Sequence, residues 1–316
     1  MYYLFGTLLT HYGSASLNHG QRKGNISPLQ KCQWYDKLHS TVNSDAIRWA
    51  LRYYWQQMDY PVNRIWDADN FVNRFTDDNF DPVQFIDDDV LGYMKPEAAK
   101  EDVVEEESSS LTQPNPEEVV EKESFKQSKS KGRNNKKGNS LQRMGALGVN
   151  RAISLIPYNG TMTFNSKSGK KDRTSLHFLE YHNTHYQYVF ALDTNHLKDK
   201  SRIFAVIDGL MSICKVGGHN NVSCYDFSPE SFVLRWTQKI SPQIFYCFEQ
   251  SQSEPEIKSD LIEEIKVGDI DAKELWIGGK IVKNTKVNKA NIFPGKEETI
   301  TNLKKVIMKD LKLIIP

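Results

Sequence analysis

The apolar positions of the chain fall mostly into short runs that predict strands. Tyr2–His11 and Ser228–Thr237 are rich in aromatic and branched residues and carry few charges, which is typical of buried strands. Further strands are predicted over Tyr158–Asn165 and Ser175–Asp193, with a basic hairpin tip over Ser166–Arg173 between them.

Two segments show the helical period instead. Ser40–Trp55 has a polar start, in which Asn43 or Ser44 is expected to cap the first turn. Its apolar stripe consists of Ile47, Ala50, Leu51 and Tyr54. A second amphipathic helix is predicted over Lys200–Lys215.

The first predicted helix has two interpretations. Its N-terminus carries hydroxyl and amide side chains, and Arg48 and Arg52 project from one side, an arrangement suited to phosphates. An ordinary amphipathic helix with solvated arginines explains the same pattern, and the helix alone favours that simpler interpretation.

The order of these elements predicts an α+β fold. Strand, helix, an interrupted middle with strands, helix and strand follow one another, as in a split βαβ sheet of the ferredoxin or RRM type with large insertions. In the last third, Glu256–Ile265 is expected to be helical, Glu274–Val282 to form a hairpin, and Asn302–Pro316 to form a helix or a strand.

Charge is informative only in its distribution. The 316 residues include 41 Lys and Arg against 40 Asp and Glu, so the net charge of +1 indicates no partner. Lys95–Ser140, however, is acidic in its first half and basic in its second, with almost no aromatics. This composition predicts a disordered insertion whose basic half suits a polyanion.

Catalytic and metal-binding signatures are missing from the sequence. There is no Walker loop, GxGxxG, GxSxG or HExxH motif, and the 4 cysteines have no zinc spacing, so we expect reduced core thiols, no metal, no cofactor and no catalysis. Asp87, Asp88 and Asp89 predict a local turn or an interaction surface. The apolar N-terminus is too short to span a bilayer, which predicts a cytoplasmic protein without a membrane partner.

Two polar loops remain as candidate binding elements. The first loop, His11–Asn25, offers glycines and the donors Ser14, Ser16, Asn18, Arg22 and Lys23, and Lys31 follows shortly afterwards. Val216–Phe227 is glycine-rich and lacks a phosphate-loop lysine, so a tight helix-to-strand turn explains it as well as a phosphate cradle does.

Four segments together resemble the RAMP-type backbone subunit of CRISPR Cascade complexes, in its DevR-type branch from type I-B systems. They are Tyr3–Gly20, Ser40–Trp55, Phe85–Met94 and Val216–Thr237, and the resemblance covers about residues 1–95 and 141–240. Such modules also occur inside transposons that use guide RNA, and the sequence does not place the chain in one.

The resemblance implies an RRM-like palm with finger and thumb insertions. It implies palm segments at 1–59 and 181–237, a finger-like insertion at 60–94, a thumb-like insertion at 141–180 and a C-terminal extension at 238–316. The implied partners are crRNA, target DNA through the guide, further copies of the chain and other Cascade subunits.

The resemblance also implies which residues bind RNA. They are Ser14, Ser16, Asn18, Lys31, Ser40, Asn43, Ser44, Arg48, Arg52, Arg143, Met144, Arg151, His219 and Asn220. Met144 is the candidate wedge that splays one base from the guide. Related subunits cleave target RNA with an aspartate in the first loop, but His11–Gln30 contains no acidic residue.

Two other functions stay open at this point. One is a RAMP-fold endoribonuclease that processes precursor crRNA with His11 or His219. The other is a protein scaffold that binds no RNA.

Overall fold

The computed structural model describes residues 1–95, 141–166, 176–217, 224–252, 254–285 and 287–313. These divide into a large unit, 1–93 with 144–316, and a small unit, 94–143. The predicted disordered insertion, Lys95–Ser140, and the basic hairpin tip lie almost entirely outside the described residues.

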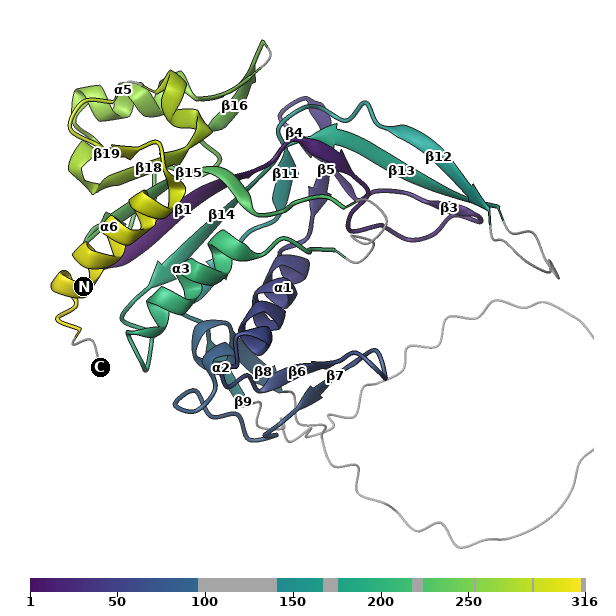
Figure 1. The fold of residues 1–316 in the computed structure, drawn as a ribbon, viewed down its shortest axis with the longest axis horizontal. Coiled ribbons are helices and arrows are strands. Elements are labelled where there is room, and N and C mark those ends of the chain that lie inside the picture. The colour runs from purple at the N-terminus through teal and green to yellow at the C-terminus, as the bar shows by residue number, and fades with distance from the viewer. Residues whose placement is uncertain (96–140, 167–175, 218–223, 253, 286, 314–316) are drawn as a thin grey trace, which may run out of the picture. The chain divides into compact units, whose positions relative to one another are not determined.

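A large mixed sheet organises the large unit (Figure 1). Among the described residues its strand order is β19-β18-β15-β1-β14-β11-β5-β4, and β10 also pairs with β14. The strands are β1 Tyr3–Thr10, β4 Lys31–Trp34, β5 Lys37–Val42, β10 Leu147–Val149, β11 Ala152–Ser154, β14 Tyr186–Asp193, β15 Pro229–Thr237, β18 Leu275–Gly279 and β19 Asn291–Phe293.

Strand β1 lies at the centre of this sheet and is buried on both faces. It runs antiparallel to β14 on one side and to β15 on the other. Leu4 and Leu8 enter one apolar core, while Phe5 and Leu9 enter the other. The side-chain period of two therefore supplies both cores from one strand, as expected for the two predicted buried strands β1 and β15.

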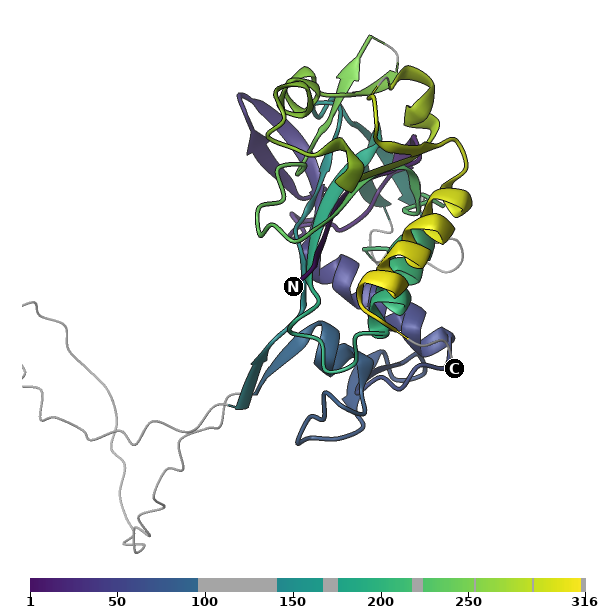
Figure 2. The ribbon, with the colours of Figure 1, turned by 90° about the vertical axis from the view of Figure 1, so that its left-hand side faces the viewer.

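Three helices share one face of the sheet: α1 Ser44–Gln57, α3 Arg202–Ser212 and α6 Lys296–Asp310 (Figure 2). Their apolar residues belong to a single core with Leu4 and Leu8. Helix α5, Ser259–Val267, packs in the other core through Leu261. The mixed α+β class and the predicted helices at Lys200–Lys215 and Glu256–Ile265 are confirmed, and the last segment is a helix.

The predicted cap of the first helix is confirmed, but the polar residues expected to precede it in the same helix belong to a strand. Ser40 and Thr41 belong to β5, where Ser40 pairs with Lys31 of β4, and the helix begins at Ser44. Asn43 is the N-cap, and its side chain accepts a hydrogen bond from the Asp45 amide at 3.4 Å. The polar residues before the helix therefore divide between a strand and a cap.

Smaller sheets surround the large one. Their strands are β2 Gly13–Ala15, β3 Ile26–Ser27, β6 Arg64–Asp67, β7 Val72–Phe75, β8 Gly92–Lys95, β9 Leu141–Met144, β12 Thr161–Ser166, β13 Leu176–Thr184, β16 Phe248–Ser251 and β17 Glu254–Ile257. Strands β12, β13, β2 and β3 form one sheet, and the others pair as β6-β7, β8-β9 and β16-β17. The strands predicted over Tyr158–Asn165 and Ser175–Asp193 are thereby confirmed.

Two expectations about the last third and the cysteines were wrong. No hairpin forms over Glu274–Val282, because β18 lies between β15 and β19, and Gly279 (φ 95°) turns the chain into the 3₁₀ helix Lys280–Asn284. Among the cysteines only Cys247 is buried, while Cys214 and Cys224 are exposed. None of the described helices is long and apolar enough to cross a membrane.

The acidic run Asp87–Asp89 is buried, which corrects its interpretation as a turn or an interaction surface. It lies in the short helix α2, Ile86–Val90, and its side chains are 2%, 3% and 0% exposed. Asp87 accepts hydrogen bonds from the amides of Asn63 and Arg64 at 2.7 and 3.0 Å. Buried carboxylates need such donors, because an unpaired buried charge is costly.

The other two aspartates hold different segments. Asp88 accepts hydrogen bonds from the side-chain amide of Asn63 and from the Asp81 amide. Asp89 accepts from the Lys198 amide at 2.9 Å and pairs with Arg202 of α3 at 2.8 Å. The run thus joins the finger-like segment to the start of α3.

We expect Asp88 to make stability fall as the pH rises from about 4 to about 6. Burial, and then the neighbouring Asp87 charge, raise the pKa of Asp88 to about 6. The native state then keeps a proton that the unfolded chain releases near pH 4, so ionisation costs folding free energy in this window. Asp88→Asn cannot ionise and should gain up to about 3 kcal/mol relative to the unmodified chain as the pH rises from 4 to 7.

Denaturant unfolding at several pH values measures this difference. Asp36→Asn is the matched control, because Asp36 is exposed. A stability difference between Asp88→Asn and the unmodified chain that stays constant from pH 4 to 7 would contradict the assignment.

Candidate nucleic-acid interface

Backbone hydrogen bonds bring four predicted segments together at what we name the loop junction, Asn18, Gln30, Thr41 and Gly217. The Asn18 amide donates to the Gly217 carbonyl at 2.9 Å, the Gln30 amide to the Asn18 carbonyl at 3.4 Å, and the Thr41 amide to the Gln30 carbonyl at 2.8 Å. The first loop, the segment at Lys31, the strand before α1 and the start of the glycine-rich loop therefore lie side by side.

Two features hold the glycine-rich loop in this place. Gly217 has φ +80°, and a Cβ there would lie 2.9 Å from the Asn18 amide nitrogen, so only glycine fits without strain. At the far end of the loop the buried Tyr225 hydroxyl donates to the His11 carbonyl at 2.8 Å and lies 2.6 Å from the Thr10 hydroxyl. His219 and Asn220, the residues expected to bind RNA, lie outside the described residues.

The first loop divides its polar side chains between the surface and the interior. Ser14 is exposed on β2. Ser16 is buried, and its hydroxyl donates to the Glu180 carbonyl at 2.8 Å. Asn18 is half-buried in the left-handed region at φ 51°. Ser14 is therefore open to a ligand, whereas the side-chain nitrogen of Asn18 is buried and Ser16 fixes the loop to β13.

Lys31 is already paired within the protein. Its Nζ lies 2.5 Å from Glu180 Oε2 and over the Tyr158 ring at 4.2 Å. Burial opposes the charge of Glu180, but hydrogen bonds from Lys31 and the Leu29 amide outweigh it and keep the pKa of Glu180 below its usual value. The same burial and carboxylate raise the pKa of Tyr158 to about 12.

Ser40 does not reach the surface, which corrects its expected place on a phosphate-binding helix end. It is 0% exposed. Its hydroxyl lies 2.7 Å from His182 Nδ1 and 2.8 Å from the Tyr186 hydroxyl. Burial lowers the pKa of His182 to about 4, so the ring is neutral at pH 7. These contacts hold the Ser40 hydroxyl inside the protein.

The start of α1 keeps two of its expected groups accessible. Asn43 and Ser44 are half-buried, and the Ser44 hydroxyl donates to the Asn43 side-chain oxygen at 3.3 Å. The helix start lies two residues after Thr41 of the loop junction. Its polar end is consequently close to the first loop.

Arg48 and Arg52 bind the fold, so the expectation that both face a guide is corrected. Arg48 donates to the Leu91 carbonyl at 2.8 Å. Arg52 Nε lies 3.5 Å from Asp87 Oδ2, and its side chain is 13% exposed. Burial lowers the pKa of Arg52 to about 10, against the opposing effect of Asp87. Both arginines serve the contact between α1 and the segment around α2.

The remaining predicted residues lie in β9 and directly before β11. Arg143 and Met144 end strand β9, and Met144 is 76% exposed. Arg151 is exposed beside β11, and its carbonyl accepts a hydrogen bond from Tyr246. Arg151 therefore lies near Asn43, because Ala152 pairs with Val42 where β11 runs beside β5.

The sequence did not single out one surface that the structure presents, the sheet of β2, β3, β12 and β13. Met162 and Phe164 alternate along β12 and are 51% and 69% exposed. Arg22 and Lys23, exposed residues of the first loop, lie next to β3, which pairs with β13. The alternating pattern of β12 was the available signal for this surface, because it places Met162 and Phe164 on one side.

The histidines offer limited acid–base chemistry. His11 Nδ1 lies 3.1 Å from Glu230, and His11 Nε2 lies 3.8 Å from Asp226. Nearby His185 is buried, which lowers its pKa. In the described part of the chain, no three His, Cys, Asp or Glu side chains are grouped to hold a metal ion.

Comparisons with known proteins agree on one family. No family model matches the chain. A CRISPR-associated protein Cas7/Cst2/DevR from Myxococcus xanthus (strain DK1622) is 32% identical over 311 residues, which cover 93% of this chain and 92% of that protein.

Solved structures show the same fold. A chain of a pre-nicking CRISPR RNA-guided surveillance complex matches with a TM-score of 0.56 and 10% identity, over 96% of this chain and 100% of that chain. A chain of another CRISPR RNA-guided surveillance complex matches with a TM-score of 0.52 and 12% identity, over 97% and 99%. With its likeness to the Myxococcus protein over nearly its whole length, the chain belongs to the Cas7/Cst2/DevR family of CRISPR-associated proteins.

Proposed function

We propose that this protein is a non-catalytic, crRNA-binding backbone subunit of a type I-B Cascade complex. It assembles with further copies of itself and with other Cascade subunits along the guide RNA, and it supports pairing of the guide with target DNA. The observation that carries the proposal is the loop junction, which gathers most of the polar segments suited to phosphates at one place on the large unit.

The sheet topology supports an RRM-like palm at 1–59 and 181–237 that is completed by strand β11 from the segment 141–180. The central order β15-β1-β14-β11 is antiparallel throughout, with α1 before β11 and α3 between β14 and β15. This is the order of a split βαβ unit, with both helices on one face. The finger-like part at 60–94 and the C-terminal extension at 238–316 then join this palm.

The RNA-contacting surface begins at the loop junction and continues over the β12–β13 sheet. Accessible groups there are the hydroxyl of Ser14, the half-buried amide of Asn43, and the cations Arg22 and Lys23. Exposed Phe164 adds a ring on which a base can stack. In this proposal the segment 141–180 is the thumb-like part, and Met144 or a side chain of β12 is the wedge that splays one base from the guide.

We expect phosphate contacts to dominate binding. The double variant Arg22→Ala/Lys23→Ala should weaken binding of guide-length RNA similarly for all sequences. Each single-strand phosphate contact contributes about 0.7 to the slope of log affinity against log salt, so the slope should fall by about 1.4. Fluorescence anisotropy over a salt series measures it.

The matched control is Lys305→Ala/Lys309→Ala. These lysines are also exposed, but they lie on α6, away from the first loop. Equal losses of affinity and slope in the two double variants would contradict the proposed surface.

The endoribonuclease function is the second candidate, because His11 is paired with Glu230 at 3.1 Å. We expect no cleavage when the purified chain is incubated with repeat RNA without metal, since neighbouring His185 is buried and its lowered pKa disfavours its acting as a second acid beside His11. Denaturing gel electrophoresis of the RNA checks this result. Cleavage that disappears in His11→Ala and persists in His196→Ala, an exposed histidine elsewhere, would support the nuclease instead.

A further inference from the structure

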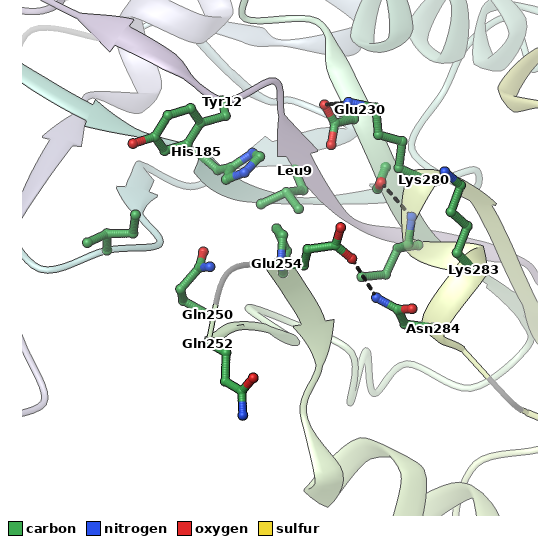
Figure 3. Close-up of a pocket in the computed structure, with 14 residues that line it drawn as sticks. Leu9, Tyr12, His185, Glu230, Gln250, Gln252, Glu254, Lys280, Lys283 and Asn284 are labelled. Carbon is green, nitrogen blue, oxygen red and sulfur yellow. Dashed lines mark hydrogen bonds and ion pairs between the residues drawn. The ribbon is translucent and has the colours of Figure 1, made fainter.

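A cavity of about 520 Å³ lies at the end of β1, beside the point where the first loop begins (Figure 3). Its lining comes from β1 and β15, from Tyr12, Ile156 and His185 outside the strands, from the β16–β17 hairpin and from the 3₁₀ helix Lys280–Asn284. The size is within the range of small-ligand pockets. None of the RNA contacts proposed above uses it.

One buried acceptor in the cavity has no protein partner. Gln250 Oε1 is shielded from solvent, and no group in the described part of the chain donates to it. In Figure 3 the Gln250 amide lies on the side of the cavity opposite Lys280 and Glu254. A buried unpaired acceptor costs free energy, so a ligand N–H placed there would recover it.

An aromatic ring stands at the same cavity. Tyr12 is 58% exposed, and its ring centroid lies 5.3 Å from that of His185. The two rings are tilted by 58° to each other, so His185 lies beside Tyr12 while much of the Tyr12 ring is open to a flat partner. Aromatic rings of this kind stack well on nucleobases.

The charges of the lining balance, which favours a neutral ligand group. Glu230 pairs with Lys280 at 2.7 Å and with His11 at 3.1 Å. Glu254 accepts a hydrogen bond from the Asn284 amide at 3.0 Å. A phosphate would meet two carboxylates there, whereas a base meets an open ring and an unpaired acceptor.

We propose that this cavity binds a nucleobase that carries an N–H donor, with Tyr12 stacking on it and Gln250 Oε1 accepting the N–H. The inference rests on the proposed function in one respect: the base belongs to the RNA held at the first loop, which begins beside Tyr12. A free nucleoside shares the same chemistry.

Two nucleosides test the acceptor directly in the full chain. Adenosine has an exocyclic N–H, whereas N6,N6-dimethyladenosine has none there and keeps the stacking face. Titration followed by saturation-transfer NMR should show about tenfold tighter binding of adenosine, and Gln250→Leu should abolish that preference. Gln238→Leu, which changes an exposed glutamine outside the cavity, should retain it. Equal binding of the two nucleosides, or no saturable binding, would overturn the proposal.

A second pair of variants tests stacking and the source of the base. Tyr12→Phe keeps the ring and should bind adenosine normally, while Tyr12→Ala should lose at least about fivefold. Tyr12→Ala should also weaken RNA binding without changing its salt slope. If Tyr12→Ala loses nucleoside binding but keeps its RNA affinity, the base in the cavity does not come from the bound RNA. Salt-dependent RNA binding without nucleoside binding would overturn the cavity and leave the proposed function standing.

Discussion

The structure depends most on how strand β1 ends. Strand β1 is buried on both faces and paired on both edges, so its backbone position is fixed up to Leu9. Between Leu9 and Thr10 its register with β15 shifts. Thr10 then becomes a connection point: its hydroxyl accepts from the Tyr186 amide at 2.8 Å and bonds the Tyr225 hydroxyl, and its carbonyl lies 2.8 Å from His185 Nδ1. The start of β14, the glycine-rich loop and the first loop are all fixed from this one residue.

The sequence predicted what local pattern determines. Buried strands β1 and β15, helices α3 and α5, and the cap at Asn43 follow from periodicity and side-chain chemistry within a few residues. Local pattern could not predict which polar side chains are buried, because their burial depends on partners far away in the sequence. Arg52 finds Asp87, Lys31 finds Glu180, and Ser40 finds His182, each across a separation that no local pattern encodes.

These internal ion pairs change which charges are available to a ligand. A cation bound to a buried carboxylate cannot neutralise a phosphate without leaving that carboxylate uncompensated, which is costly. Arg52 thus stabilises α1 against the segment around α2. In the interface that we propose, the exposed cations Arg22 and Lys23 and the polar groups of the loop junction take the role expected of the helix arginines.

Photocrosslinking of guide-length RNA that carries 4-thiouridine, followed by mass spectrometry of the crosslinked peptides, tests the central claim most directly. The account predicts crosslinks in the first loop and in β12–β13, on the side of the loop junction. Crosslinks confined to α5 and α6 would contradict this claim. RNA that binds in a salt-sensitive way but gives no crosslink to the first loop or to β12–β13 would contradict it as well.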